Sequence, residues 1–180
     1  GFGSQRHDLM YNDFILVGPK DDPAQIGTAK TTIEAFQKIA GAKARFASRS
    51  DDSGTHKAER RFWQAANTTP TDASGKWYLE TGLGMGATLN FAVQADAYAL
   101  TDRATWLTFK NKTTHMPLYQ GDPALFNQYG VVLVSQTHCP TIKAAESRIF
   151  VDWLLSPKGQ NAIATFQHEN RPLFFPNATP

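Results

Sequence analysis

The feature of this chain that most constrains its fold is the alternation of short apolar runs with segments of helical periodicity. Residues 11–17 and 130–135 are apolar runs of strand length bounded by turn-forming residues, which predicts two buried strands. Residues 32–39, 54–66 and 144–155 instead repeat apolar side chains at the spacing of one helix face. Weaker strand patterns lie at 44–47, 77–79 and 98–101, and helical ones at 87–94, 102–107 and 159–166. This alternation predicts an α/β fold with layered helices and strands.

Composition narrows the classes of function. The 180 residues suffice for one sizeable core or for two small lobes that share a sheet. The net charge of +2 is small and its Lys and Arg are dispersed, which argues against a nucleic-acid or membrane-surface partner. No apolar run approaches the roughly 20 residues of a membrane span. The single Cys139 excludes an intrachain disulfide, and we expect it to be inert.

Residues 48–56, Ser-Arg-Ser-Asp-Asp-Ser-Gly-Thr-His, carry the clearest chemistry and are called the anion loop here. They lie between a predicted strand and a predicted helix, whose N-terminus offers unpaired N–H groups and a positive dipole end. The guanidinium of Arg49 and the Ser and Thr hydroxyls add donors for a tetrahedral oxyanion. The alternative is that Ser53 or Asp52 only caps the helix and that Arg49 is a surface cation.

The same stretch also suggests a metal-dependent enzyme or a metal-binding protein that uses Asp51, Asp52 and His56. No second histidine lies at ligand spacing from His56. Ser53 with Asp52 and His56 has the groups of a hydrolase, but adjacent residues cannot point at one another as a triad requires. We therefore expect no catalytic residues, no metal and no cofactor, and keep the metal-protein reading as the alternative.

A glycine cluster at residues 82–87 matches G-x-G-x-x-A, and Asp102 follows near the offset of a ribose-binding acid. Glu80 and Thr81 precede it, however, where a dinucleotide site needs an apolar buried strand. A flexible turn that opens a helix is the favoured interpretation.

Five separated segments then combine into a resemblance that covers essentially the whole chain. They occur in the order 11–19, 48–56, 78–86, 98–103 and 152–160. Together they closely resemble the tungstate-binding proteins of ABC importers, a periplasmic-binding-protein-like family of type II architecture. The resemblance implies a periplasmic or secreted protein that binds tungstate or molybdate and passes it to a permease, without enzyme chemistry.

The resemblance also implies site residues. In the family, the segment Ser-Arg-Gly-Asp-x-Ser-Gly-Thr-His supplies the arginine and threonine that grip the oxyanion. The matching residues expected to bind the ligand here are Ser48, Arg49, Ser53, Gly54 and Thr55, and His56 matches as well. Ser50 replaces the usual glycine, which would strain the loop if that position has a positive φ.

A second departure concerns the start of the chain. Proteins of this family open with a strand and a Thr/Ser-rich loop that forms the other wall of the cleft, and this chain starts downstream of it. The resemblance thus implies a complete lobe at 17–130, and a crossing strand with the C-terminal half of the other lobe at 1–16 and 131–180. An incomplete lobe would expose apolar surface for self-association. We expect the chain alone to bind an oxyanion at least about a hundredfold more weakly than a form with both walls.

Overall fold

The computed structural model describes residues 1–179 and divides the chain into two compact units. Unit 1 comprises Gly1–Asn12 and Asn127–Pro180, and unit 2 comprises Asp13–Phe126. Pro180, the end of the expected range 131–180, lies outside the described residues. That 17–130 is a complete lobe and that 1–16 with 131–180 is an incomplete one stays a prediction.

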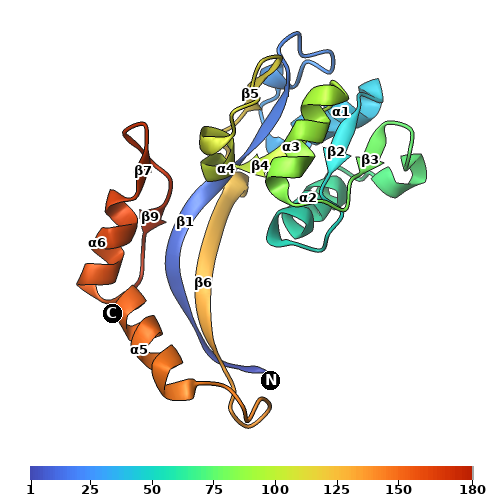
Figure 1. Cartoon of the computed structure of the whole chain (residues 1–180). Coiled ribbons are helices and arrows are strands. Elements are labelled where there is room, and N and C mark those ends of the chain that lie inside the picture. The colour runs from blue at the N-terminus through green and yellow to red at the C-terminus, as the bar shows by residue number, and fades with distance from the viewer. Residues whose placement is uncertain (180) are drawn as a thin grey trace. The chain divides into compact units, whose positions relative to one another are not determined.

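The elements of unit 2 alternate between strands and helices (Figure 1). They are the end of β1 (Gly3–Pro19), η1 (Ile26–Thr28), α1 (Thr32–Ala42), β2 (Phe46–Ser48), α2 (Gly54–Ala65), η2 (Pro70–Ala73), β3 (Tyr78–Glu80), α3 (Met85–Gln94), β4 (Ala99–Asp102), α4 (Arg103–Thr108), β5 (His115–Tyr119) and η3 (Pro123–Leu125). Unit 1 contains the start of β1, β6 (Phe126–Val134), α5 (Ala144–Leu155), α6 (Pro157–Thr165), β7 (Gln167–His168), β8 (Arg171–Pro172) and β9 (Phe175–Pro176).

The strands of unit 2 form a mixed sheet. β1 lies between β4 and β5 and is antiparallel to both. β2 and β3 pair in parallel, from Phe46 opposite Tyr78 to Ser48 opposite Glu80. A parallel bridge between Phe46 and Tyr98, just before β4, connects this pair to the rest of the sheet. The carboxyl ends of β2 and β3 therefore lie side by side.

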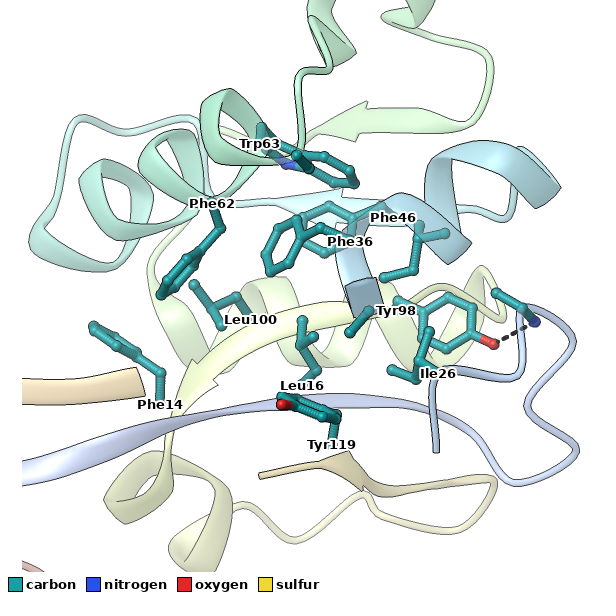
Figure 2. Close-up of a cluster of buried hydrophobic side chains, with 14 of the residues drawn as sticks. Phe14, Leu16, Ile26, Phe36, Phe46, Phe62, Trp63, Tyr98, Leu100 and Tyr119 are labelled. Carbon is teal, nitrogen blue, oxygen red and sulfur yellow. Dashed lines mark hydrogen bonds between the residues drawn. The ribbon is translucent and has the colours of Figure 1, made fainter. Parts of the chain in front are cut away.

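Helices cover both faces of this sheet. Successive side chains of β1 point to opposite faces, so alternate residues of this strand pack against different helices. Phe14 and Leu16 join the buried cluster drawn in Figure 2, with side chains of α1 and α2. Ile15 and Val17 join a second cluster with side chains of α3 and α4. In the first cluster, the Tyr98 hydroxyl accepts a hydrogen bond from the Ala24 N–H at 2.8 Å. The α/β fold predicted from the sequence is confirmed.

Several boundaries differ from the sequence-based expectation. β1 starts at Gly3 instead of residue 11, because its polar first half pairs with β6. α1 continues through Gly41 to Ala42, and its C-cap Lys43 takes the left-handed conformation with a φ of 50°. α2 begins at Gly54 as predicted, after the Ser53 cap.

In unit 1, the strand predicted at 130–135 forms as part of β6, but its expected burial is wrong. Val132 and Val134 are 45% and 50% exposed. On α5, Ile149 and Phe150 are also largely exposed, at 70% and 58%. Within residues 1–179, the helices are all too short or too polar to span a bilayer.

Candidate functional site

The anion loop connects the end of β2 to the start of α2. Ser48 ends β2 and is fully buried. Ser50 and Asp52 both have positive φ, 47° and 58°, so the chain turns sharply twice before the helix. Ser53 is the N-cap, and its Oγ accepts a hydrogen bond from the His56 N–H at 3.3 Å. The first N–H groups of α2 have no intrahelical partners and face the end of this loop.

The three hydroxyls predicted to bind the ligand have different environments. Ser53 Oγ caps α2, as described above. Ser48 Oγ donates to Glu59 Oε2 at 2.8 Å and accepts from the Ser50 N–H at 3.2 Å. Thr55 is 9% exposed, and its hydroxyl has no hydrogen-bond partner among residues 1–179. Thr55 is thus the hydroxyl most available to an incoming oxyanion.

Arg49 is paired within the loop. Its Nε lies 3.1 Å from Asp51 Oδ2, and its Nη2 donates to the same oxygen. Asp51 Oδ1 accepts from the Ser53 N–H at 3.2 Å. Although desolvation would raise the pKa of Asp51, the hydrogen bonds from Ser53 and Arg49 lower it to about 2. Asp51 therefore occupies the guanidinium edge that an oxyanion would use.

The metal-binding alternative finds no support in the arrangement of its three residues. Asp51 is engaged by Arg49 and Ser53, and His56 Nδ1 accepts the Asp52 N–H at 3.0 Å. Over the described part of the chain, no three His, Cys, Asp or Glu side chains are grouped to hold a metal ion. The dinucleotide alternative also loses its acid, because Asp102 caps α4 by accepting from the Thr105 N–H at 2.8 Å.

A second helix N-terminus lies at the same edge of the sheet. Thr81 follows β3 and binds the Ser48 carbonyl through both its N–H (3.0 Å) and its hydroxyl (2.9 Å). Gly82 has a positive φ of 64°, and Gly84 is the N-cap of α3. The glycine cluster is thus the expected turn that opens a helix. Thr81 brings the start of this turn next to the anion loop.

Behind the anion loop lies a buried polar cluster. Glu59 on α2 is 1% exposed and accepts hydrogen bonds from Ser48, Tyr78 and Trp63. Burial is the largest influence and raises the pKa of Glu59 to about 7, despite those three hydrogen bonds. Burial, followed by the charge of Glu59, also raises the pKa of Tyr78.

A surface hollow of about 760 Å³ flanks this region, between α2 and the segment that contains η2. From the anion loop, Ser50 and His56 line it, together with the basic side chains Lys57, Arg60 and Arg61. The five residues predicted to bind the ligand are not part of its lining. The anion loop therefore borders the hollow through Ser50 and His56, and not through the five residues predicted to bind the ligand.

The structure brings the five predicted residues together along one loop, and their assignment to a ligand stays a prediction. Sequence reasoning missed Glu59 and Thr81 as members of this region. Glu59 lies in a charged stretch of α2, and such a stretch indicates a solvent-exposed helix face. The signal for Thr81 was its place after a strand-like segment, but only the pairing of β2 with β3 puts it beside Ser48.

This chain is similar in sequence to a known protein family and to several named proteins. Residues 1–158 match the family described as PBP superfamily domain. The chain is 41% identical over 182 residues to the tungstate-binding protein TupA of Peptoclostridium acidaminophilum, covering 99% of this chain and 63% of that protein. The chain spans between about half and two thirds of the curated relatives it matches.

This chain is also similar in fold and sequence to solved protein structures. The tungstate-binding protein TupA from Desulfovibrio alaskensis G20 has a TM-score of 0.79 and 39% identity, over 99% of this chain and 72% of that one. The tungstate ABC transporter structure from Geobacter sulfurreducens has a TM-score of 0.80 and 42% identity, over 92% of this chain and 69% of that one.

Proposed function

Because this chain belongs to the PBP superfamily domain family, we propose that it is a solute-binding protein that captures a tetrahedral oxyanion for an ABC importer. Tungstate is the first candidate, because similar proteins are named for tungstate binding. Molybdate is the second, since it has the same shape and charge.

The observation that carries this proposal is the combination of donors at the start of α2. Arg49 offers a planar fork, and Thr55 offers a hydroxyl that has no hydrogen-bond partner among residues 1–179. Thr55 lies in the first turn of a 12-residue helix, whose positive dipole end favours an anion, and Arg49 is linked to the start of that helix through Asp51, which accepts from the Ser53 N–H. Ser53 and Gly54 complete the predicted contacts through the backbone at this end. Ser48 supports the loop, since its hydroxyl is already bonded to Glu59.

The magnitudes require several of these donors to act together. Micromolar affinity corresponds to about 8 kcal/mol, whereas one charge-assisted hydrogen bond contributes about 1.5–3 kcal/mol. Arg49, Thr55 and the helix amides reach that sum only where water is excluded. The site is therefore expected to bind weakly on one wall alone and tightly where a second wall desolvates the anion.

The proposed role is binding and delivery, not catalysis. The partner is the permease of an ABC importer, which places the protein in the periplasm or outside the cell. The exposed apolar side chains of α5 supply a further expected contact: Ile149 and Phe150 point to self-association through unit 1. Sedimentation velocity over a range of concentrations tests it, and Ile149→Glu should shift any dimer toward monomer.

The decisive experiment is calorimetric titration of the chain with tungstate, molybdate, sulfate and phosphate at equal ionic strength. We expect tungstate and molybdate to bind more tightly than sulfate and phosphate. Elemental analysis after dialysis addresses the metal-protein alternative, which requires stoichiometric divalent metal. Binding of none of the four anions, also by a longer form of the protein, would refute the proposed function.

A further inference from the structure

Glu59 is the one carboxylate that is buried among residues 1–179. It lies on α2, five residues after the start of that helix, and contacts the end of β2 through Ser48. A carboxylate in this position stands one hydrogen bond behind the anion loop. Its charge is therefore relevant to any anion that the loop binds.

The hydrogen bonds around Glu59 are compatible with an ionised carboxylate. Trp63 Nε1 and Tyr78 Oη donate to Oε1, at 3.1 and 2.7 Å, and Ser48 Oγ donates to Oε2 at 2.8 Å. Three donors on two oxygens satisfy most of the acceptor capacity of the charged group. No cation is among the partners that these hydrogen bonds provide, so burial of the charge stays costly.

The same atoms also accommodate a protonated Glu59. Tyr78 Oη lies 3.0 Å from Ser48 Oγ, so Glu59, Ser48 and Tyr78 form a triangle with edges of 2.7, 2.8 and 3.0 Å. Each hydroxyl carries one proton, so an ionised Glu59 leaves two protons for three edges. A neutral Glu59 supplies the third, and all three edges can then hold hydrogen bonds that run in one sense around the ring.

The surroundings of Glu59 favour uptake of this proton. Desolvation, with a smaller contribution from the charge of Glu80 on β3, raises its pKa to about 7, although its three hydrogen bonds act in the opposite direction. His56, one turn earlier on α2, lines the neighbouring hollow together with Tyr78 and Glu80. From the other elements packed on α2, the cluster contains apolar side chains, Phe36 of α1 and Leu100 of β4.

We propose that Glu59 is a positioning residue of the anion loop, whose gain of a proton completes the ring with Ser48 and Tyr78 and strengthens oxyanion binding. This inference rests on the proposed function. Two effects act in the same direction. Protonation removes a negative charge behind the bound anion, and the completed ring fixes Ser48 Oγ, which holds the Ser50 N–H at 3.2 Å. Binding and proton uptake are then reciprocally linked.

The first test needs no ligand. The Trp63 indole N–H donates to Glu59 Oε1, so its NMR signal reports directly on the carboxyl. We expect the Trp63 indole and Ser50 amide signals to titrate together with a midpoint near pH 7. Glu59→Gln should abolish both titrations. Glu146→Gln, which changes an exposed glutamate on α5, is the matched control and should leave both unchanged. Signals that do not titrate in the unaltered chain would overturn the proposal.

The second test measures tungstate affinity between pH 6 and 8.5. We expect binding at pH 6 to be at least about fivefold tighter than at pH 8.5, as a rise of about one unit in the pKa of Glu59 on binding gives over this range. Glu59→Gln mimics the protonated ring, because its amide nitrogen donates to Ser48 while its oxygen accepts from Trp63 and Tyr78. This variant should bind at all pH values as the unaltered chain does at pH 6.

The outcomes separate this proposal from the proposed function. A Trp63 signal that titrates, together with equal tungstate affinity at both pH values, would overturn the linkage between Glu59 protonation and oxyanion binding, but not the ring itself. Absence of tungstate binding at every pH would refute the proposed function, while the Trp63 and Ser50 signals would still decide whether Glu59 protonation moves the loop. If Glu59→Gln does not fold, Tyr78→Phe replaces it: this variant opens the ring, so the Ser50 amide signal should no longer titrate together with the Trp63 indole signal, and a Ser50 titration as large as in the unaltered chain would contradict the ring.

Discussion

Arg49 directs two nitrogens, Nε and Nη2, at a single oxygen of Asp51, two residues further along the anion loop. The guanidinium is thereby held in one orientation and partly withdrawn from solvent, with 18% of its side chain exposed. An oxyanion that binds Arg49 must share or displace this carboxylate. The pair therefore makes Arg49 both better positioned and less available.

Arg49→Lys should weaken tungstate binding at least about tenfold, or on the order of 1.4 kcal/mol, because a lysine keeps the charge but loses the planar fork. Isothermal titration calorimetry measures the change. Arg45→Lys is the matched control, since Arg45 lies on the same unit and donates to the Ala95 carbonyl at 3.0 Å. Unchanged affinity in Arg49→Lys would remove Arg49 from the site.

Asp51→Asn should tighten tungstate binding by up to about fivefold. Release of an ion pair near the surface frees about 0.2–1 kcal/mol of competing interaction. Asp52→Asn is the control, because Asp52 pairs with Lys57 at 3.3 Å instead. Weaker binding in Asp51→Asn would mean that the carboxylate orients Arg49 more than it competes.

The lowered pKa of Asp51 also predicts that the folded protein loses stability at acidic pH. Its pKa is lowered in the folded protein from 3.8 to about 2, so its contribution is present above about pH 4 and is lost as the pH falls through 2. Urea unfolding at a series of acidic pH values should show a steeper loss for the unaltered chain than for Asp51→Asn. Parallel curves would indicate that the pair adds nothing to stability.

The raised pKa of Glu59 predicts the opposite pH dependence, in which the stability of the folded protein falls as the pH rises. Its pKa is raised on folding from 4.5 to about 7, so the folded protein binds this proton more tightly than the unfolded chain. The contribution to stability is present below about pH 4.5 and is lost as the pH rises through 7, roughly 3 kcal/mol in all. Unfolding midpoints of the unaltered chain should fall across this range relative to those of Glu59→Gln.

Ser50→Gly should stabilise the chain slightly. Ser50 has a φ of 47°, where a side chain costs on the order of 1–2 kcal/mol, but its hydroxyl also donates to Glu80 at 3.1 Å. Ser74→Gly is a close control, because Ser74 donates to the same carboxylate from a negative φ of −55°. Denaturant midpoints should rise for Ser50→Gly and fall for Ser74→Gly; a fall in both would show that the Glu80 bond outweighs the backbone strain.

The parts of the fold that the sequence predicts are those governed by local signals. α2 starts where a capping serine precedes an amphipathic stretch, and the structure confirms that start. α1 runs past Gly41 because a glycine inside a helix costs only about 1 kcal/mol, which packing easily offsets. The first half of β1 is polar, and only its pairing with β6 makes it a strand.

The candidate site divides in the same way. Arg49, Ser53 and Thr55 can be predicted from the sequence because they lie within seven consecutive residues at the start of a helix. Glu59 is not visible, since its burial depends on Tyr78, which lies 19 residues further along the chain. Long-range partners of this kind leave no periodic pattern, so a charged residue on a helix is read as exposed.

The ring of Glu59, Ser48 and Tyr78 has a consequence for the order of folding. It joins residues separated by 11, 19 and 30 positions, from the end of one parallel strand, through the crossover helix, to the start of the next strand. Parallel pairing is rewarded only after the whole crossover has closed, which makes it a late event. In a refolding reaction, the Trp63 indole should therefore acquire its native environment last, together with the assembled strand–helix–strand unit.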